Sequence, residues 1–238
     1  MSLRRIGPCL VLFILVSSLY LPSLRNGFVY DDDPLILKQA RPQSISSFIQ
    51  IFREQHFPNL PYYRPITRLT MVVQKYLHGD QPAPYHLFNA LLMGGAAVCV
   101  FILLCTPVFR VKAGVAFSAA LLFGVHPVAS SCVYPICSGR ETLLPAFFML
   151  CAVIAHLRSG SSWRWLTLAF FTLALFSKEQ AVVFPLVLVL ADVCRLTDVA
   201  PPWSWKSWVR RYAGMVIVIG IYFVIRYLLF RGSEFTTE

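Results

Sequence analysis

Long runs of apolar residues, separated by short polar or charged segments, dominate the chain. An α-helix needs about 20 mainly apolar residues to cross the hydrocarbon core of a bilayer, and several runs approach that length. From them we predict seven membrane-spanning helices, at residues 9–24, 85–109, 113–125, 142–157, two crossings within 163–194, and 212–230. The pattern therefore predicts an all-α, polytopic membrane protein built as a helical bundle.

The run at 163–194 is interrupted by Lys178 and Glu179. Two adjacent ionised residues at the centre of a single span are energetically costly. Two crossings that meet at this pair avoid that cost, and they also place the arginine-rich loop after Cys194 on the same side as the N-terminus. We therefore divide the run into two helices.

The first run follows Arg4 and Arg5, and two interpretations of it are open. It is either a signal peptide that is cleaved after the small residues Ser17 and Ser18, or an uncleaved anchor. The apolar character continues beyond Ser18, which favours the anchor. Both interpretations leave the segment that follows outside the cytoplasm.

Residues 25–84 separate the first two apolar runs and are too long for a simple connector. Within them, residues 44–53 and 68–77 carry apolar side chains at helical spacing, which predicts two amphipathic helices at the membrane interface. Residues 1–238 show no repeat of the kind that forms tetratricopeptide (TPR) helices. We therefore expect a single membrane domain with a long outer loop and no TPR domain.

Composition and charge agree with a membrane protein. Apolar residues make up 57% of the 238 residues and charged residues 13%, which excludes a soluble globular domain, a disordered chain and a collagen-like chain. The net charge of +10 does not indicate nucleic-acid binding, because the cations flank the apolar runs. The cations that this topology places in the cytoplasm are Arg4, Arg5, Arg110, Lys112, Arg158, Arg164, Arg195, Lys206, Arg210 and Arg211. Only Asp192 and Asp198 oppose them, which is a strong positive-inside pattern.

Three carboxylates, Asp31, Asp32 and Asp33, closely follow the first run and lie near the outer membrane surface in this topology. Crowded like charges raise one another's pKa, which suits a general base or a cation site. The alternative is a solvated acidic turn that ends at Pro34, with Asp33 capping a helix. The acidic run is therefore the first candidate site.

A second candidate is the segment 62–68, in which Tyr63 and Arg64 combine an aromatic ring with a fixed cation. Arginine binds phosphate through parallel hydrogen bonds and tyrosine favours the headgroup region, so the segment is either a phosphate site or a lipid-headgroup anchor. His78, His86 and His126 lie on the same predicted face. No carboxylate stands at ligand spacing from these histidines, so the spacing does not support a metal site. A divalent metal stays open as the less favoured alternative, and no other cofactor is indicated.

Two further charged pairs stand at successive outer turns. Arg140 and Glu141 lead into the predicted span at 142–157, and Lys178 and Glu179 close the next outer turn. Taken singly, each pair has a simpler explanation, in which its long side chains extend from the helix end to the lipid headgroups. If the first pair stands at the N-terminus of its helix, Glu141 opposes the positive end of the helix dipole and Arg140 is free for an anion. Two such pairs on one face suggest a shared polar cavity.

These motifs occur in one order along the chain: Phe28-Val29-Tyr30-Asp31-Asp32, Tyr63-Arg64-Pro65 with Thr67-Arg68, Tyr85-His86-Leu87 with Asn89, His126-Pro127 with Ser138-Gly139-Arg140-Glu141, Ser177-Lys178-Glu179, and Asp192. Together they resemble the membrane part of the transmembrane-and-TPR O-mannosyltransferases and their bacterial relatives. Those proteins are members of the GT-C superfamily of polyprenyl-phosphate-sugar-dependent glycosyltransferases. The resemblance extends over nearly the whole chain and implies a GT-C-like bundle.

The resemblance also implies a mechanism. A polyprenyl-phosphate donor docks from the outer leaflet, and an acceptor hydroxyl attacks the anomeric carbon of its sugar, such as mannose. Asp31 and Asp32 match the position of the base that accepts the hydroxyl proton. Fixed cations suit the leaving phosphate, where negative charge develops, and the candidates are Arg64, Arg140 and Lys178. Further candidates to line the cavity are Tyr63, His86, His126, Glu141 and Glu179.

The expected partners are the lipid donor, a protein or lipid-linked acceptor, the bilayer, and a second chain that supplies further helices or TPRs. Members of this family have more than seven spans and also contain TPRs, whereas we predict seven spans and no TPRs for this chain. We therefore expect an incomplete GT-C module. The membrane is the plasma membrane if the source is bacterial and the endoplasmic reticulum if it is eukaryotic. The alternative is a non-catalytic protein, either a transporter subunit or a scaffold. A transporter is expected to have paired repeats and ionisable groups near mid-span, and we find neither.

Overall fold

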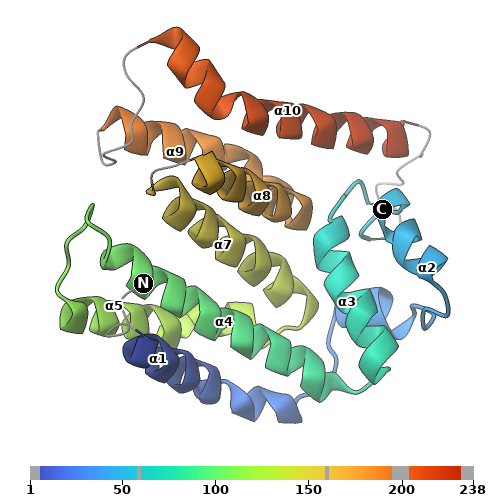
Figure 1. Ribbon diagram of the computed structural model, residues 1–238. Coiled ribbons are helices and arrows are strands. Elements are labelled where there is room, and N and C mark those ends of the chain that lie inside the picture. The colour runs from blue at the N-terminus through green and yellow to red at the C-terminus, as the bar shows by residue number, and fades with distance from the viewer. Residues whose placement is uncertain (1–5, 58–59, 159–160, 195–203, 232–238) are drawn as a thin grey trace.

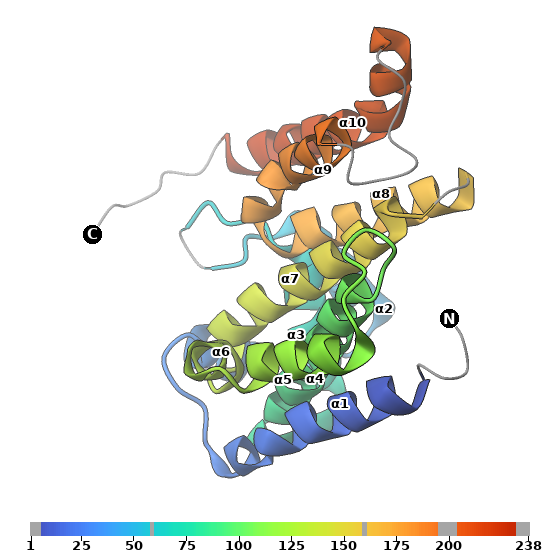
Figure 2. The ribbon, with the colours of Figure 1, turned by 90° about the vertical axis from the view of Figure 1, so that its left-hand side faces the viewer.

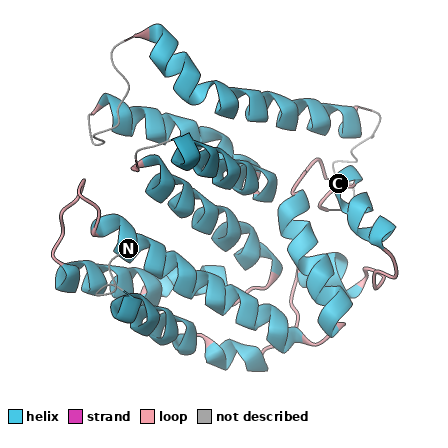
Figure 3. Cartoon of the chain, viewed as in Figure 1, coloured by secondary structure: helices cyan, strands magenta, loops and turns pink. Residues whose placement is uncertain are grey.

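The computed structural model describes residues 6–57, 60–158, 161–194 and 204–231, and within these ranges it consists of helices, turns and loops without a strand (Figure 3). This confirms the all-α fold class. The apolar runs form helices because the backbone N–H and C=O groups find no water within a bilayer. In a helix these groups form hydrogen bonds with one another inside the same segment.

Seven of the described helices coincide with the predicted apolar runs. They are α1 (Ile6–Leu19), α4 (Pro82–Leu104), α5 (Ala113–Val125), α7 (Cys137–His156), α8 (Ser161–Ser177), α9 (Phe184–Val193) and α10 (Trp205–Phe230). They cross the molecule in alternating directions, with α1 and α10 on opposite sides of the bundle (Figures 1 and 2). We call the end where α1 finishes and α4 and α7 begin the site end, and the other the opposite end.

Fewer than seven of these helices are long enough to cross a membrane. By length and composition four described segments qualify: α1 with the following turn η2 (Leu21–Arg25), and α4, α7 and α10. A fifth is obtained if α5 and the short helix α6 (Pro127–Val133), which are bent by 57°, count as one broken span. The 10 residues of α9 cover only about 15 Å, half of a hydrocarbon core. The multi-pass architecture is confirmed, but the predicted number of seven full spans is too high.

The helix boundaries also differ from the prediction at α7. This helix begins at Cys137 and not at Thr142, so that Arg140 and Glu141 lie within its first turns. The reason is a distant cap, because the Cys137 N–H donates to Asp32 Oδ1 at 3.0 Å. The rest of the predicted outer loop at 124–141 contains α6, whose first turn is capped by the ring of His126.

The two predicted amphipathic segments are confirmed as helices. The first contains α2 (Ile45–Gln50) and the turn η4 (Ile51–Arg53), and the second lies within α3 (Pro65–His78). Met71 on the inner face of α3 is 1% exposed and packs with Leu35 of the turn η3 (Asp33–Leu37) and with other buried apolar residues. The outer segment therefore folds back against the bundle and forms one wall of its site end.

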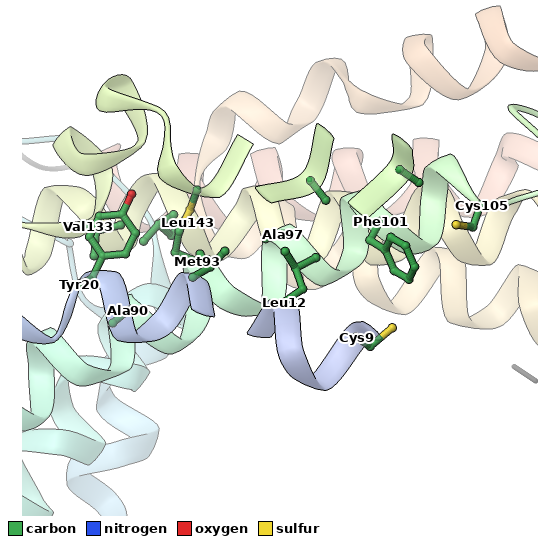
Figure 4. Close-up of a cluster of buried hydrophobic side chains, with 13 residues drawn as sticks. Cys9, Leu12, Tyr20, Ala90, Met93, Ala97, Phe101, Cys105, Val133 and Leu143 are labelled. Atoms are coloured by element: carbon green, nitrogen blue, oxygen red, sulfur yellow. The ribbon is translucent and has the colours of Figure 1, made fainter. Parts of the chain in front are cut away.

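Helices α1, α4 and α5 share one apolar core, which Figure 4 shows in close-up. Small residues let these helices approach closely. A Cβ on Gly94 of α4 would lie 2.2 Å from Ser17 Oγ of α1, and a Cβ on Gly124 of α5 would lie 2.7 Å from Val16. Tyr20, just after α1, donates its hydroxyl to the Gly124 carbonyl at 2.7 Å. Close approach at small residues is the usual way in which helices associate within lipid.

A second apolar core joins α7, α8, α9 and α10. Phe171 of α8 and Tyr222 of α10 have no exposed surface in this core. Elsewhere α10 exposes large apolar side chains such as Val216 at 64% and Ile217 at 60%. Such a face is expected to contact lipid, because acyl chains are as apolar as these side chains.

The topology gives the first testable prediction. Lys206 is an exposed residue at the opposite end, and Gln180 is an exposed residue at the site end. With Cys194 replaced by Ser and the protein in vesicles whose interior is the cytoplasmic side, a membrane-impermeant thiol reagent should label Lys206→Cys only after the vesicles are opened. It should label Gln180→Cys on the same vesicles while they are intact. Labelling of position 206 from the outer side would overturn the predicted sidedness.

Candidate active site

Arg64 lies at the centre of a buried cluster of charges at the site end. Its side chain, which directly precedes α3, is only 7% exposed. Nη1 donates to Glu141 Oε2 on α7 at 2.5 Å, and Nε and Nη2 donate to the two carboxylate oxygens of Glu179 at 2.9 and 2.6 Å. Bidentate contacts of this kind are among the strongest charge-assisted hydrogen bonds. One side chain thus joins the outer segment, α7 and the turn η5 (Glu179–Val183).

His56 binds the other oxygen of Glu141. Its Nε2 lies 2.5 Å from Glu141 Oε1, and its ring has no exposed surface. Burial lowers the pKa of His56, and the hydrogen bond to Glu141 offsets part of this shift. Glu141 is therefore held by two residues that precede it by 77 and 85 positions in the chain.

Helix α3 is fixed to its neighbours by two adjacent polar residues. The hydroxyl of Thr67, which has no exposed surface, donates to the Ser177 carbonyl at the end of α8 at 2.8 Å. Arg68 donates to the Glu54 carboxylate and to the carbonyl of Gln55. These contacts hold the loop that carries His56 in place against the bundle.

Arg140 is the most deeply buried cation at the site end. It has no exposed surface, and its donors are taken up by Asn89 Oδ1 at 3.1 Å and the Tyr85 carbonyl at 3.0 Å. Its guanidinium also lies over the ring of Phe88, 4.5 Å from the centroid. Asn89 in turn donates to the carbonyl of Ile136 at 3.0 Å, just before α7. Arg140 was predicted to be available to an anion, and the structure places it in contacts that join α7 to α4.

Asp32 is likewise fixed. It is 2% exposed, and each of its oxygens accepts a backbone N–H, from Val29 at 2.9 Å and from Cys137 at 3.0 Å. The second bond places a carboxylate at the N-terminus of α7, where the helix dipole favours negative charge. The start of α7 also lies close to the backbone of Cys132. A Cβ on Gly139 would lie 2.4 Å from the Cys132 carbonyl oxygen, so a glycine is needed at this position.

A cavity of about 470 Å³ opens beside the acidic run. Asp31, Asp32 and His86 supply ionisable groups to its wall, and Tyr134 and Pro135 lie across from the loop that carries the two aspartates. Ser138, one residue before the close contact at Gly139, also faces it. The cavity is of the size that small-molecule sites have.

Asp31 differs from its neighbours in this run. It is partly exposed, whereas Asp33 forms an ion pair with Lys38 at 2.5 Å on the surface. Burial raises the pKa of Asp31, and the carboxylates of Glu141 and Asp32 raise it further. A carboxylate with a raised pKa and access to a cavity is suited to accept a proton.

The structure brings together only part of the predicted site. Asp31, Asp32 and His86 line one cavity, but Arg64, Arg140 and Lys178 are not in its wall. Lys178 begins the turn η5 and is partly exposed, and among the described residues no carboxylate pairs with it. Arg64 and Arg140 instead join helices and loops at the site end through buried hydrogen bonds.

Two other candidates lie outside the cavity. His126 is exposed, and its Nδ1 accepts the N–H of Val128 at the start of α6. Tyr63 is 2% exposed, donates its hydroxyl to the Phe52 carbonyl at 3.1 Å, and packs against Tyr222 in the second core. Both residues hold the fold of the site end. Within the described ranges, no three His, Cys, Asp or Glu side chains form a group that could hold a metal ion.

Several curated proteins are similar to the chain. Protein O-mannosyl-transferase TMTC3 of Homo sapiens is 32% identical over 184 residues, which cover 70% of this chain and 19% of that protein. Protein O-mannosyl-transferase TMTC4 of Homo sapiens is 33% identical over 195 residues, covering 67% of this chain and 26% of that protein. Protein O-mannosyl-transferase Tmtc2 of Drosophila melanogaster is 30% identical over 239 residues, covering 92% of this chain and 24% of that protein.

These matches confirm the predicted resemblance to the transmembrane-and-TPR O-mannosyltransferases. The chain spans about a fifth to a quarter of the length of the curated relatives it matches. No protein-family model matches the chain, and no solved structure matches it.

The charge cluster gives a stability prediction. Arg64→Met removes the cation that pairs with the buried Glu141 and with the partly exposed Glu179, so the free energy of unfolding should fall by about 3 kcal/mol. The exposed Arg53 offers a control, and Arg53→Gln should change stability by less than about 0.5 kcal/mol. Thermal unfolding in detergent measures both.

A combined variant separates a lost ion pair from lost packing. Arg64→Met with Glu141→Gln and Glu179→Gln removes both stranded carboxylates, and it should recover part of the stability that Arg64→Met loses. If Arg64→Met alone were as stable as Arg53→Gln, the cluster would not be what holds the outer segment to the bundle.

Proposed function

We propose that this chain, which shares about 30% identity with part of the protein O-mannosyl-transferases, carries the site of a membrane glycosyltransferase. In this proposal it transfers a mannosyl group from a polyprenyl-phosphate donor to a hydroxyl group of an acceptor protein on the outer side of the membrane. The observation that carries the proposal is the cavity at the site end, into which Asp31 and Asp32 face together with His86.

Asp31 is the base in this mechanism. The acceptor hydroxyl gives its proton to the Asp31 carboxylate as its oxygen forms a bond to the anomeric carbon, and the bond from that carbon to the donor phosphate breaks. Asp32 supports this role as a positioning residue, because both of its oxygens already accept backbone N–H groups. Its fixed negative charge also helps to raise the pKa of Asp31.

The leaving phosphate needs a cation that is not already neutralised. Arg64 shares its charge between two carboxylates, and Arg140 has no exposed surface. Lys178 is the remaining candidate of the three, since it is partly exposed at the turn next to Glu179. We assign the donor phosphate to Lys178, which lies outside the wall of the cavity that contains Asp31, so in this proposal the donor extends from that cavity to the turn η5.

The central test is the replacement of the base. Asp31→Asn keeps the shape of the side chain but removes proton acceptance, so transfer of labelled mannose from a polyprenyl-phosphate donor should slow by roughly a hundredfold or more. Binding of the donor should be retained. Asp33→Asn is the matched control, because Asp33 pairs with Lys38 on the surface, and it should retain most of the activity.

Lys178→Gln should act differently from Asp31→Asn. The phosphate is negative in the ground state and gains charge in the transition state, so this variant should weaken donor binding and slow transfer together. Full activity of both Asp31→Asn and Lys178→Gln would reject the proposed mechanism. It would then favour the alternative, a non-catalytic scaffold that uses the cavity for binding.

The raised pKa of Asp31 gives a further prediction. Because the base must be ionised, transfer should fall as the pH drops through the pKa of Asp31. The Glu141 carboxylate is one cause of the raised pKa, so Glu141→Gln should lower that pKa and move the acid limb of the pH–rate profile to lower pH. Glu54→Gln, which removes the partner of Arg68, should leave the midpoint unchanged. An unchanged midpoint in Glu141→Gln would mean that Asp31 does not control the acid limb.

A further inference from the structure

A second cavity lies at the opposite end of the bundle and has a different chemistry. Its volume is about 300 Å³, and it lies between α7, α8 and α10. Four arginines line it, namely Arg158, Arg164, Arg210 and Arg211, and no carboxylate is present among the described residues of its wall. The chemistry proposed for the site end does not use this cavity.

One of the four arginines is neutralised within the protein. Arg211 Nε lies 2.5 Å from Asp192 Oδ2, and the buried Asp192 also accepts the hydroxyl of Tyr212 at 2.8 Å and faces His156 at 3.1 Å. Because Asp192 is saturated by these contacts, it does not offset the charge of the other arginines. Arg211 is thereby fixed as part of the wall.

The other three arginines are exposed, and among the residues that the structure describes none pairs with a carboxylate. Arg158 is held in place by its neighbour, with its guanidinium 4.4 Å from the centroid of the Trp163 ring. Three uncompensated charges around one small cavity repel each other, and an anion that binds between them relieves this repulsion. The cavity therefore favours a ligand with more than one negative charge.

The remainder of the wall is apolar. Leu168 and Met215 contribute to it, and Gly214 lets α10 approach α8 closely, because a Cβ there would lie 3.1 Å from Leu168 Cδ2. Trp165, 70% exposed, stands at the same cavity. All five tryptophans of the chain lie between positions 163 and 208, and tryptophan is enriched where a membrane protein meets the headgroups.

We propose that this cavity binds the headgroup of an anionic phospholipid of the cytoplasmic leaflet, with the phosphate groups between Arg158, Arg164 and Arg210 and the acyl chains along α10. A basic rim above an apolar floor matches an amphiphile better than a free anion. The end concerned is also the one that the distribution of cations assigns to the cytoplasm, whose leaflet is rich in anionic lipids. This site is independent of the glycosyltransferase chemistry proposed for the site end.

Tryptophan fluorescence tests the proposal with the full chain in phosphatidylcholine nanodiscs. Phosphatidylinositol 4-phosphate with brominated acyl chains should quench the emission at a low lipid fraction, and brominated phosphatidylcholine at the same fraction should not. Arg164→Gln with Arg210→Gln should weaken the apparent affinity by roughly twenty-five-fold, since each of these two cavity arginines faces the lipid phosphates in this proposal and contributes about fivefold. Arg110→Gln with Lys112→Gln removes as many charges at the same end but outside the cavity, and it should cost less than about twofold.

A second pair of variants leaves every arginine in place. Gly214→Leu fills the apolar floor and should weaken quenching, whereas Gly220→Leu lies in open space on the same helix and should not. Three results would overturn the proposal: equal losses in the two double arginine and lysine variants, equal quenching by the two lipids, or displacement of the lipid by inorganic phosphate at matched ionic strength. The last result would identify a site for a free anion.

Discussion

The site end depends on one guanidinium group. Arg64 binds Glu141 of α7 and Glu179 of the turn after α8 at once, and His56 is the second partner of Glu141. Buried charges of this kind add little net stability when they are paired, but they are costly when a partner is missing. Conformations that separate the outer segment from the two helices are therefore disfavoured.

The same principle explains why adjacent aspartates have different roles. The carboxylate of Asp32 accepts two backbone N–H groups and lies against the start of α7, so its position is set by the fold. Asp31 is next to it in the chain and partly exposed at the cavity. One carboxylate thus provides a fixed negative charge that raises the pKa of the other. Pairs of acids in different environments can divide catalytic roles in this way.

Most of the fold could be predicted from the sequence, because the signal is local. Helix α5 begins and ends at the predicted residues, since its apolar run is bounded by Lys112 and by His126. The start of α7 could not be predicted in this way, because its cap is Asp32, 105 positions earlier. The number of full spans was overestimated for a physical reason, since an apolar run shows that a helix avoids water but does not fix its length. Part of the run at 163–194 forms the 3-10 turn η5 and not a helix that crosses the bilayer.

The sequence identifies candidate residues for the site, but their contacts after folding could not be predicted from it. Charged residues beside apolar runs were expected to reach outward, yet Arg140 points inward because Asn89 and backbone carbonyls offer it enough acceptors to compensate its burial. His56 was missed because nothing in its local sequence distinguishes a histidine that will meet Glu141 across 85 positions. Sequence motifs identify which ionisable groups come to one end of a bundle. A given ionisable group either holds the fold together or faces a ligand, depending on which hydrogen-bond acceptors surround it after folding. Here those acceptors come from other helices.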